Sequence, residues 1–63
     1  FYIMEYYRVL IRGKESGWHK EMVVAASNHE EAEKEADFRV GNLEFMRGEE
    51  IVIDDLFRSP LEG

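Results

Sequence analysis

The sequence contains no cysteine, so neither a disulfide framework nor a cysteine-based zinc site can stabilise the fold. No apolar run approaches the roughly 20 residues that are needed to span a bilayer. No basic segment followed by an apolar stretch indicates a signal peptide. From these absences we expect a soluble, cytoplasmic protein.

Basic residues are scarce: 14 Asp and Glu stand against 8 Lys and Arg, for a net charge of −6. The imbalance is confined to one part of the chain, since residues 1–27 carry +1 and residues 28–63 carry −7. Such a field repels nucleic acid and attracts basic protein surfaces. We therefore expect a protein partner with a basic nucleic-acid-binding surface, and neither nucleic acid nor a membrane as a direct partner. The alternative is that the acidity only keeps a small domain soluble.

The chain is short, with 63 residues, yet 44% of it is hydrophobic and 13% is aromatic. This is too much apolar character for a disordered acidic tail. Below about 70–80 residues, however, one core rarely supplies more than about 3–5 kcal/mol. We expect a single domain over residues 4–58, helped by a dimer or a partner. Residues 1–3 and 59–63 are expected to be terminal extensions derived from a vector.

Two segments of alternating polarity predict a β-hairpin. Residues 4–12 and 18–26 alternate with the period of two that is typical of half-buried strands. Between them, the polar segment 13–17 is bracketed by glycines, which suits a hairpin loop. The side chains expected to face the core are Tyr7, Val9, Ile11, Trp18, Met22, Val24 and Ala26.

A helix is predicted to begin at Asn28. The Asn28 side chain can accept a hydrogen bond as N-cap, and Glu31 can complete a capping box. Ala32, Ala36 and Val40 are spaced by four, so they line the face that packs on a sheet. Because glycine commonly ends a helix, the glycine that follows predicts an end near Val40.

The rest of the chain predicts one further strand. Residues 43–46 fit a short strand, a helical turn or a packed loop. Residues 50–57 alternate as a final strand, with Ile51, Ile53 and Asp55 on one face and Val52, Asp54 and Leu56 on the other. The predicted fold is therefore α+β: one small two-layer β-β-α-β domain with a three-stranded antiparallel sheet in the order 2-1-3. One helix covers one face of this sheet.

Acidic side chains supply the first candidate surface. Five of them crowd the expected helix, and four more lie in residues 49–55. Such a run is usually a solvated helix face. The functional alternative is nucleic-acid mimicry, in which a strip of acids occupies a basic channel in place of phosphates. The acids predicted to bind a partner are Glu30, Glu33, Asp37, Glu49, Glu50, Asp54 and Asp55.

The sheet face away from the helix supplies the second candidate surface. Tyr and Arg are enriched at the hot spots of protein interfaces, which makes Tyr6, Arg8 and Arg12 predicted partner-binding residues. The same face is a candidate homodimer interface. Sheet aromatics can also stack unpaired bases, but the net charge and the lack of an RNP-like motif favour protein contact.

Motifs for catalysis are missing from the sequence. It has no glycine-rich phosphate loop, no GxSxG and no cysteine nucleophile. The spacing of its two histidines, His19 and His29, gives no metal-ligand motif. The adjacent acids Asp54 and Asp55 are expected on opposite faces of a strand, where they cannot converge. We expect no enzyme, and so no catalytic residue, cofactor or metal.

The segment Val24–Ala36, with the sequence VAASNHEEAEKEA, joins a strand to a helix through a cap, two acids and alanines four apart. It resembles the same join in small acidic phage proteins of the kind that includes T7-type inhibitors of host bacterial RNA polymerase. The resemblance implies a host-takeover or anti-defence protein, acting in the bacterial cytoplasm. Its target would be a nucleic-acid enzyme such as RNA polymerase or a CRISPR-type nuclease. The alternative is a protein-interaction or dimerisation module without an inhibitory role.

Overall fold

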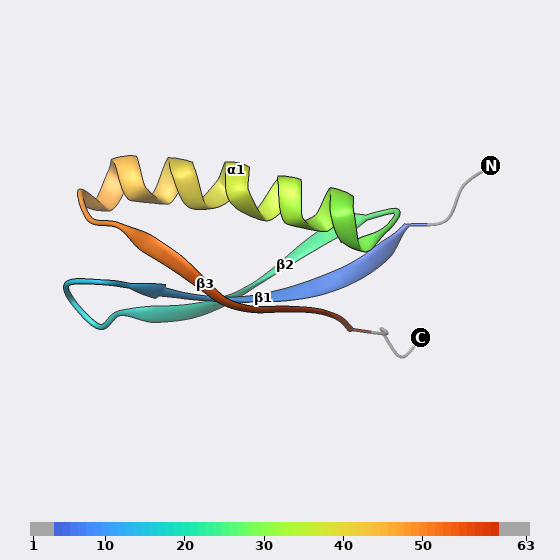
Figure 1. The fold of residues 1–63 in the computed structure, drawn as a ribbon, viewed down its shortest axis with the longest axis horizontal. Coiled ribbons are helices and arrows are strands. Elements are labelled where there is room, and N and C mark those ends of the chain that lie inside the picture. The colour runs from blue at the N-terminus through green and yellow to red at the C-terminus, as the bar shows by residue number, and fades with distance from the viewer. Residues whose placement is uncertain (1–3, 60–63) are drawn as a thin grey trace.

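The computed structural model describes residues 4–59 of the chain. Its elements follow in the order β1 (Glu5–Gly13), β2 (His19–Ala26), α1 (His29–Arg47) and β3 (Ile51–Arg58). The strands form one antiparallel sheet in the order β2-β1-β3, and α1 lies across one face of it (Figure 1). The predicted α+β fold and strand order are confirmed. In the described part of the chain, no helix has the length and apolar character required to cross a membrane.

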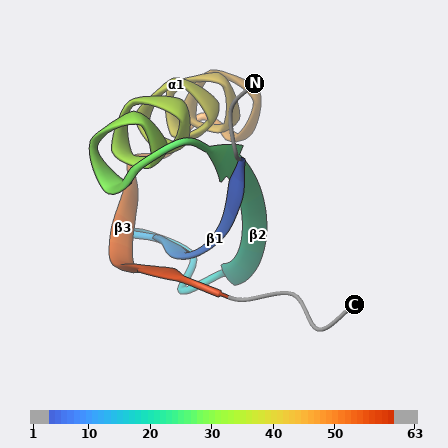
Figure 2. The same ribbon diagram turned by 90° about the vertical axis from the view of Figure 1, so that its right-hand side faces the viewer.

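A single core lies between the helix and the sheet. Its largest fully buried side chains are Val9, Ile11 and Val24, all from the strands. The helix contributes the small Ala32 and Ala36, which let its backbone lie close to the curved sheet (Figure 2). The predicted inward faces of the first two strands and of the helix are therefore correct. The complete core consists of Tyr7, Val9, Ile11, Val24, Ala26, Ala32, Ala36, Val40 and Ile51.

Asn28 caps α1, as predicted from the sequence. Its Oδ1 accepts a hydrogen bond from the Glu31 N–H at 2.9 Å, and its backbone is extended. Asn28→Ala should lower the free energy of unfolding by about 0.5–2 kcal/mol, because one helix N–H loses its partner. Chemical denaturation tests this expectation, with Asn42→Ala at an exposed position inside the helix as control. Equal midpoints for wild type and Asn28→Ala would contradict the capping role.

The end of α1 was predicted wrongly. The helix does not stop near Val40 but continues through Gly41 to Arg47. Gly48 is the actual cap, with the left-handed φ of 70° that glycine adopts without strain, and its N–H donates to the Glu44 carbonyl at 2.8 Å. The ambiguous segment 43–46 is thus helical.

Tertiary contacts explain why the helix continues past a glycine. Leu43 packs against the core, and a Glu44 carboxylate oxygen accepts a hydrogen bond from the Ile51 N–H, 2.9 Å away at the start of β3. A glycine inside a helix costs about 1 kcal/mol relative to alanine. Burial of Leu43 and the hydrogen bond to Ile51 outweigh that cost. Neither contact could be predicted from the sequence around Gly41, because both are made with other elements of the fold.

Gly41→Ala should therefore stabilise the protein. The position is helical, and a Cβ added there has no atom within 4 Å. We expect the free energy of unfolding to rise by about 0.5–1 kcal/mol. Thermal denaturation measures the change. Gly48→Ala is the matched control, because its left-handed backbone disfavours a side chain, and it should shift the midpoint in the opposite direction.

A β-bulge in β3 alters the predicted faces of that strand. The pairing with β1 skips one residue between Ile53 and Asp55, which leaves Asp54 as the extra residue. Ile53 and Leu56 consequently both pack on the core, although simple alternation put them on opposite faces. Asp54 and Asp55 both lie on the side away from the helix, so the expectation that they diverge is wrong.

Ser59, which was assigned to the C-terminal extension, is hydrogen-bonded to β1. Its N–H donates to the Tyr6 carbonyl at 2.8 Å, and its Oγ accepts a hydrogen bond from Arg8 Nε at 2.8 Å. These two hydrogen bonds join Ser59 to β1. Of the expected extensions at 1–3 and 59–63, residues 1–3 and 60–63 lie outside the described residues.

Candidate protein-binding surface

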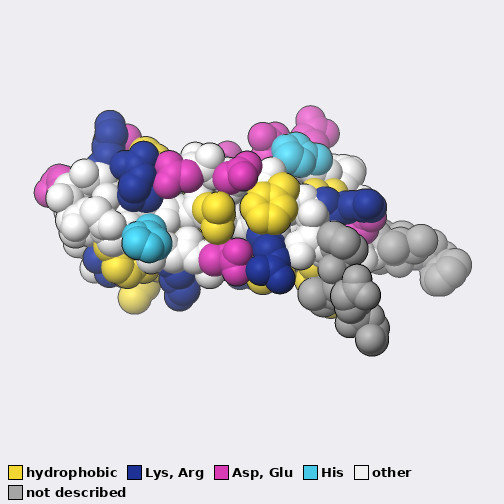
Figure 3. Space-filling model, turned by 90° about the horizontal axis from the view of Figure 1, so that it is seen from below, with side chains coloured by type: hydrophobic (Ala, Val, Ile, Leu, Met, Phe, Trp, Pro, Cys, Tyr) yellow, Lys and Arg dark blue, Asp and Glu magenta, His cyan; other side chains and the backbone are white. Residues whose placement is uncertain are grey.

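The face of the sheet that α1 leaves uncovered is the candidate site, called the open face below. Val23 from β2 and Phe57 from β3 lie opposite Arg8 of β1, with Tyr6 and Leu10 next to it on the same strand. Tyr6, Val23 and Phe57 are 41%, 47% and 39% exposed. Figure 3 shows hydrophobic side chains in the middle of this face, with charged side chains around them. The open face thus has an apolar centre and a charged rim.

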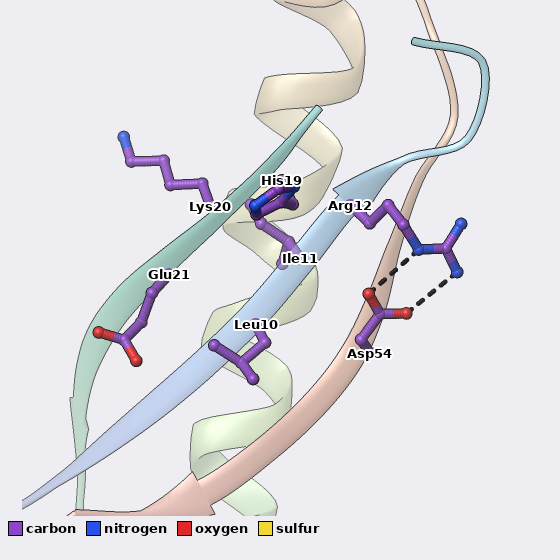
Figure 4. A pocket seen from close by; sticks show the side chains of 7 residues that line it. All are labelled: Leu10, Ile11, Arg12, His19, Lys20, Glu21 and Asp54. Carbon is purple, nitrogen blue, oxygen red and sulfur yellow. Dashed lines mark hydrogen bonds and ion pairs between the residues drawn. The ribbon is translucent and has the colours of Figure 1, made fainter. Parts of the chain in front are cut away.

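A shallow hollow of about 400 Å³ lies on the open face. Leu10 stands at its centre, with Glu21 on one side and the pair of Arg12 and Asp54 on the other (Figure 4). His19 from β2 also lines it. Because the hollow opens to solvent on the surface of the sheet, it suits a protruding side chain of a partner better than an enclosed small molecule.

Acids hold both arginines of the open face in place. Arg12 donates from Nε to one Asp54 oxygen at 3.1 Å and from Nη2 to the other at 3.0 Å. These hydrogen bonds raise the pKa of Arg12 above its ordinary value. Arg8 donates from Nη1 to Glu21 at 3.0 Å and from Nε to Ser59. The guanidinium groups are therefore fixed beside the apolar centre, although exposed ion pairs add little to stability.

Three predicted helix acids line one flank of α1. Glu30, Glu33 and Asp37 are exposed and spaced by three and four residues, so they share a side of the helix. Glu44 continues this flank seven residues further on, and its hydrogen bond to Ile51 shows that the flank faces β3. Figure 3 shows acidic side chains gathered along one long edge of the molecule.

The acids predicted beyond the helix divide into two groups. Asp54 and Asp55 lie at the bulge of β3, on the same side of the domain as the helix flank. Asp55 accepts a hydrogen bond from the Leu56 N–H at 2.9 Å. Glu50 lies before β3 and pairs with Lys14 at 3.6 Å. The structure therefore brings the helix acids and the bulge acids to the β3 side of the domain. Glu50 does not join them, because it lies next to Lys14 of the hairpin loop.

Glu49 is bound inside the fold and is not available as a surface acid. Its side chain is 8% exposed. One carboxylate oxygen accepts hydrogen bonds from the Glu15 and Ser16 N–H groups, and the other from Ser16 Oγ and Arg47 Nε, at 2.9 to 3.2 Å. Gly13 leaves room for this carboxylate, since a Cβ there would lie 2.7 Å from it. Glu49 thereby joins the hairpin loop to the end of α1.

The Glu49 network predicts a pH dependence of stability. The hydrogen bond from the Ser16 N–H is the main cause that lowers the pKa of Glu49 below its ordinary 4.5. A lowered acid pKa adds stability that is fully present above the ordinary value and is lost as pH falls through the folded-state pKa. Glu49→Gln should therefore unfold at a lower temperature than wild type near neutral pH, and the two should converge below about pH 4.5.

Thermal denaturation over a pH series tests this prediction. Glu50→Gln is the matched control, because the Glu50 carboxylate is exposed and makes one long ion pair with Lys14. A difference between wild type and Glu49→Gln that stays constant into acid would contradict the assigned network.

Sequence reasoning missed three features of the open face. Phe57 was assigned to no face, and the bulge at Asp54 places it on the open face, opposite Arg8. Val23 was not chosen as a binding residue, although it lies on the open face opposite Arg8. The hollow around Leu10 depends on the spacing of three strands. The two consecutive aspartates within an apolar strand were the one local signal for the bulge.

The histidines do not form a site together. His19 lines the hollow on the open face, whereas the His29 ring packs edge-on against Tyr7, with ring centres 6.0 Å apart. Among residues 4–59, no three His, Cys, Asp or Glu side chains are grouped so that they could hold a metal ion.

Comparisons with known proteins add no family to this description. No protein-family model matches the chain, and no curated protein or solved structure is significantly similar to it.

Proposed function

We propose that the protein is a small acidic binding protein that contacts another protein through its open face. The observation that carries the proposal is the uncovered apolar centre, where Val23 and Phe57 flank Arg8, with Tyr6 and Leu10 next to it on β1, while acids fix the arginines. An apolar centre within a polar rim is the usual anatomy of a protein interface. Tyr6 is the expected anchor, since tyrosine is enriched at hot spots.

The acids on the β3 side support a basic partner. Glu30, Glu33, Asp37 and Asp55 are exposed, and they adjoin the side of the sheet where Phe57 lies. Their field attracts a basic protein surface and repels nucleic acid. The partner that we propose is a host protein with a basic nucleic-acid-binding surface. The resemblance of the strand-to-helix join to phage inhibitors suggests RNA polymerase or a CRISPR-type nuclease, inhibited by occupation of that surface.

Binding kinetics against purified bacterial RNA polymerase and a purified CRISPR-type effector test the proposal. For the enzyme that binds, Tyr6→Ala should raise the dissociation rate about tenfold or more, with little dependence on salt. Val23→Glu should abolish binding, because it puts a charge into the apolar centre. Phe45→Ser, at an exposed aromatic on the helix layer, is the matched control and should bind as wild type does.

Two outcomes would count against the proposal. Binding that is indifferent to both Tyr6→Ala and Val23→Glu would exclude the open face as the contact surface. Tight binding without inhibition of transcription or cleavage would leave an interaction module without an inhibitory role.

A further inference from the structure

The two edges of the sheet differ in how their backbone groups are bonded. β1 lies between β2 and β3, so these two are the edge strands. On β3, the outward Ile51 N–H donates to a Glu44 side-chain oxygen, and the outward Leu56 N–H donates to Asp55, each at 2.9 Å. The bulge at Asp54 interrupts the same edge. The β3 edge is therefore closed to a further strand.

The β2 edge presents backbone groups that a further strand could bind. The Gly13 N–H donates to the Trp18 carbonyl at 2.6 Å, which fixes a hydrogen-bonded pair at the hairpin end. Because such pairs alternate along an antiparallel ladder, every second residue of β2 turns its N–H and C=O away from β1. The outward residues are His19, Glu21, Val23 and Ala25. Within residues 4–59, the pairing of β2 has no bulge, and no side chain accepts a hydrogen bond from these N–H groups.

Arg39 marks the place where an added strand would donate a hydrogen bond. Its Nη1 donates to the outward carbonyl of Val23 at 3.4 Å, while its Nε donates to Glu35 at 3.1 Å. The bond to Val23 is long and comes from an exposed side chain, so a well-aligned backbone N–H can replace it. Arg39 then keeps its pair with Glu35.

An exposed apolar side chain lies beside the same edge. Because Arg39 reaches Val23, the flank of α1 that bears Arg39 faces β2. Met46 is about two turns further along α1 and shares this flank. It is 79% exposed. A strand added to β2 would cover Met46 with the side chains that it turns toward α1.

We propose that β2 is extended by one strand of the partner protein, a segment in which apolar and basic residues alternate. The apolar side chains of the segment face α1, on the side of the sheet where Met22 and Met46 lie. Its basic side chains lie on the open face beside Glu21, and the net charge of −6 attracts them. Main-chain hydrogen bonds supply the affinity, and the alternation supplies the specificity. The inference rests on the proposed function, because the added strand continues the open face.

The curvature of the sheet favours a lone strand over a second copy of this chain. The sheet curls around α1, so a strand added to β2 continues the curve along the flank of the helix (Figure 2). A second copy paired through its own β2, with both cores on the same side, would bring a second α1 to the concave side. The two helices would then compete for the space that the curve encloses. A single extended segment carries no helix.

Amide hydrogen exchange followed by NMR tests the proposal. In the free protein, the amide protons of Met22 and Val24 should be protected, because they are bonded to β1. Those of Glu21, Val23 and Ala25 should exchange at least about tenfold faster. The peptide acetyl-KVKVKVK-amide, used as the probe strand, should slow exchange at these outward positions at least about tenfold at saturation. The protected positions should change much less.

Substitutions on β2 and α1 test the geometry of the added strand. Ala25→Pro removes one outward N–H and leaves the ladder to β1 intact, so the domain should stay folded by circular dichroism while peptide binding is lost. Ala25→Val keeps the N–H and is the matched control. Met46→Ser should weaken peptide binding about threefold or more, whereas Phe45→Ser should not.

Three results would overturn the proposal. The first is the absence of binding at millimolar peptide, or binding that leaves the outward amides of β2 unprotected. The second is equal protection by acetyl-KKKKVVV-amide, which would mean that charge alone holds the peptide. The third is protection of the same amides by rising protein concentration alone, which would place a second copy at the edge.

Phe57→Ser separates this inference from the proposed function. Phe57 lies on the open face at β3, at the opposite edge of the sheet from the proposed strand. The variant should bind the peptide as wild type does but should lose the protein partner. Retention of the partner by Phe57→Ser would contradict the proposed function, whereas unprotected β2 amides would contradict only the added strand.

Discussion

Val24→Asp is expected to unfold the protein. Val24 is 1% exposed and lies opposite Tyr7 in the core beneath α1. A carboxylate at this position would be buried without a partner, or would have to be protonated, and either costs several kcal/mol. A domain of this size has a stability of only about 3–5 kcal/mol. Circular dichroism and the dispersion of the amide proton NMR spectrum should therefore indicate an unfolded chain at room temperature.

Val23→Asp is the control for this experiment. Val23 neighbours Val24 on β2 but points to the open face and is 47% exposed. The same substitution one residue earlier should therefore leave the domain folded. A folded Val24→Asp variant beside an unfolded Val23→Asp variant would mean that the two faces of β2 are assigned in reverse.

Reversal of the three helix-flank acids should slow association with a basic target. Glu30, Glu33 and Asp37, changed together to Lys, turn an attractive field on the β3 side into a repulsive one. We expect the association rate to fall about tenfold or more while the dissociation rate changes little, because rim charges mainly steer the encounter. The effect should shrink at high salt, where exposed charges are screened beyond about 8–10 Å.

The control variant has the same change in net charge, but its three substitutions lie elsewhere on the surface. Glu15 lies on the hairpin loop. Glu31 and Glu35 lie on α1, but away from its β3-facing flank. Their joint change to Lys should slow association much less. Equal slowing by both triple variants would mean that net charge alone steers the encounter, and slowing by neither would contradict charge mimicry.

Local signals explain what the sequence could predict. The Asn28 cap and the alternation of β1 and β2 depend on residues a few positions apart, so the hairpin, the helix start and the buried faces follow from the pattern. The end of α1 depends instead on Ile51 and on the burial of Leu43. Those contacts form only after β3 joins the sheet, so Gly41 was taken as a terminator.

The candidate site was predictable to a similar extent. Helical spacing predicts that Glu30, Glu33 and Asp37 share a flank, although only the contacts of Glu44 show that this flank faces β3. Glu49 could not be separated from the surface acids, because its partners in the hairpin loop are more than thirty residues away in the sequence.

Capture of binding partners from bacterial extract by three immobilised forms of the protein tests the central claim most directly. Wild type and Phe45→Ser should retain the same protein, with a basic nucleic-acid-binding surface, because the open face is intact in both. Val23→Glu should lose that protein, since its new charge lies in the apolar centre of the open face. Retention of the same protein by Val23→Glu, or recovery of RNA in its place by the wild type, would contradict the claim that the open face binds a protein partner.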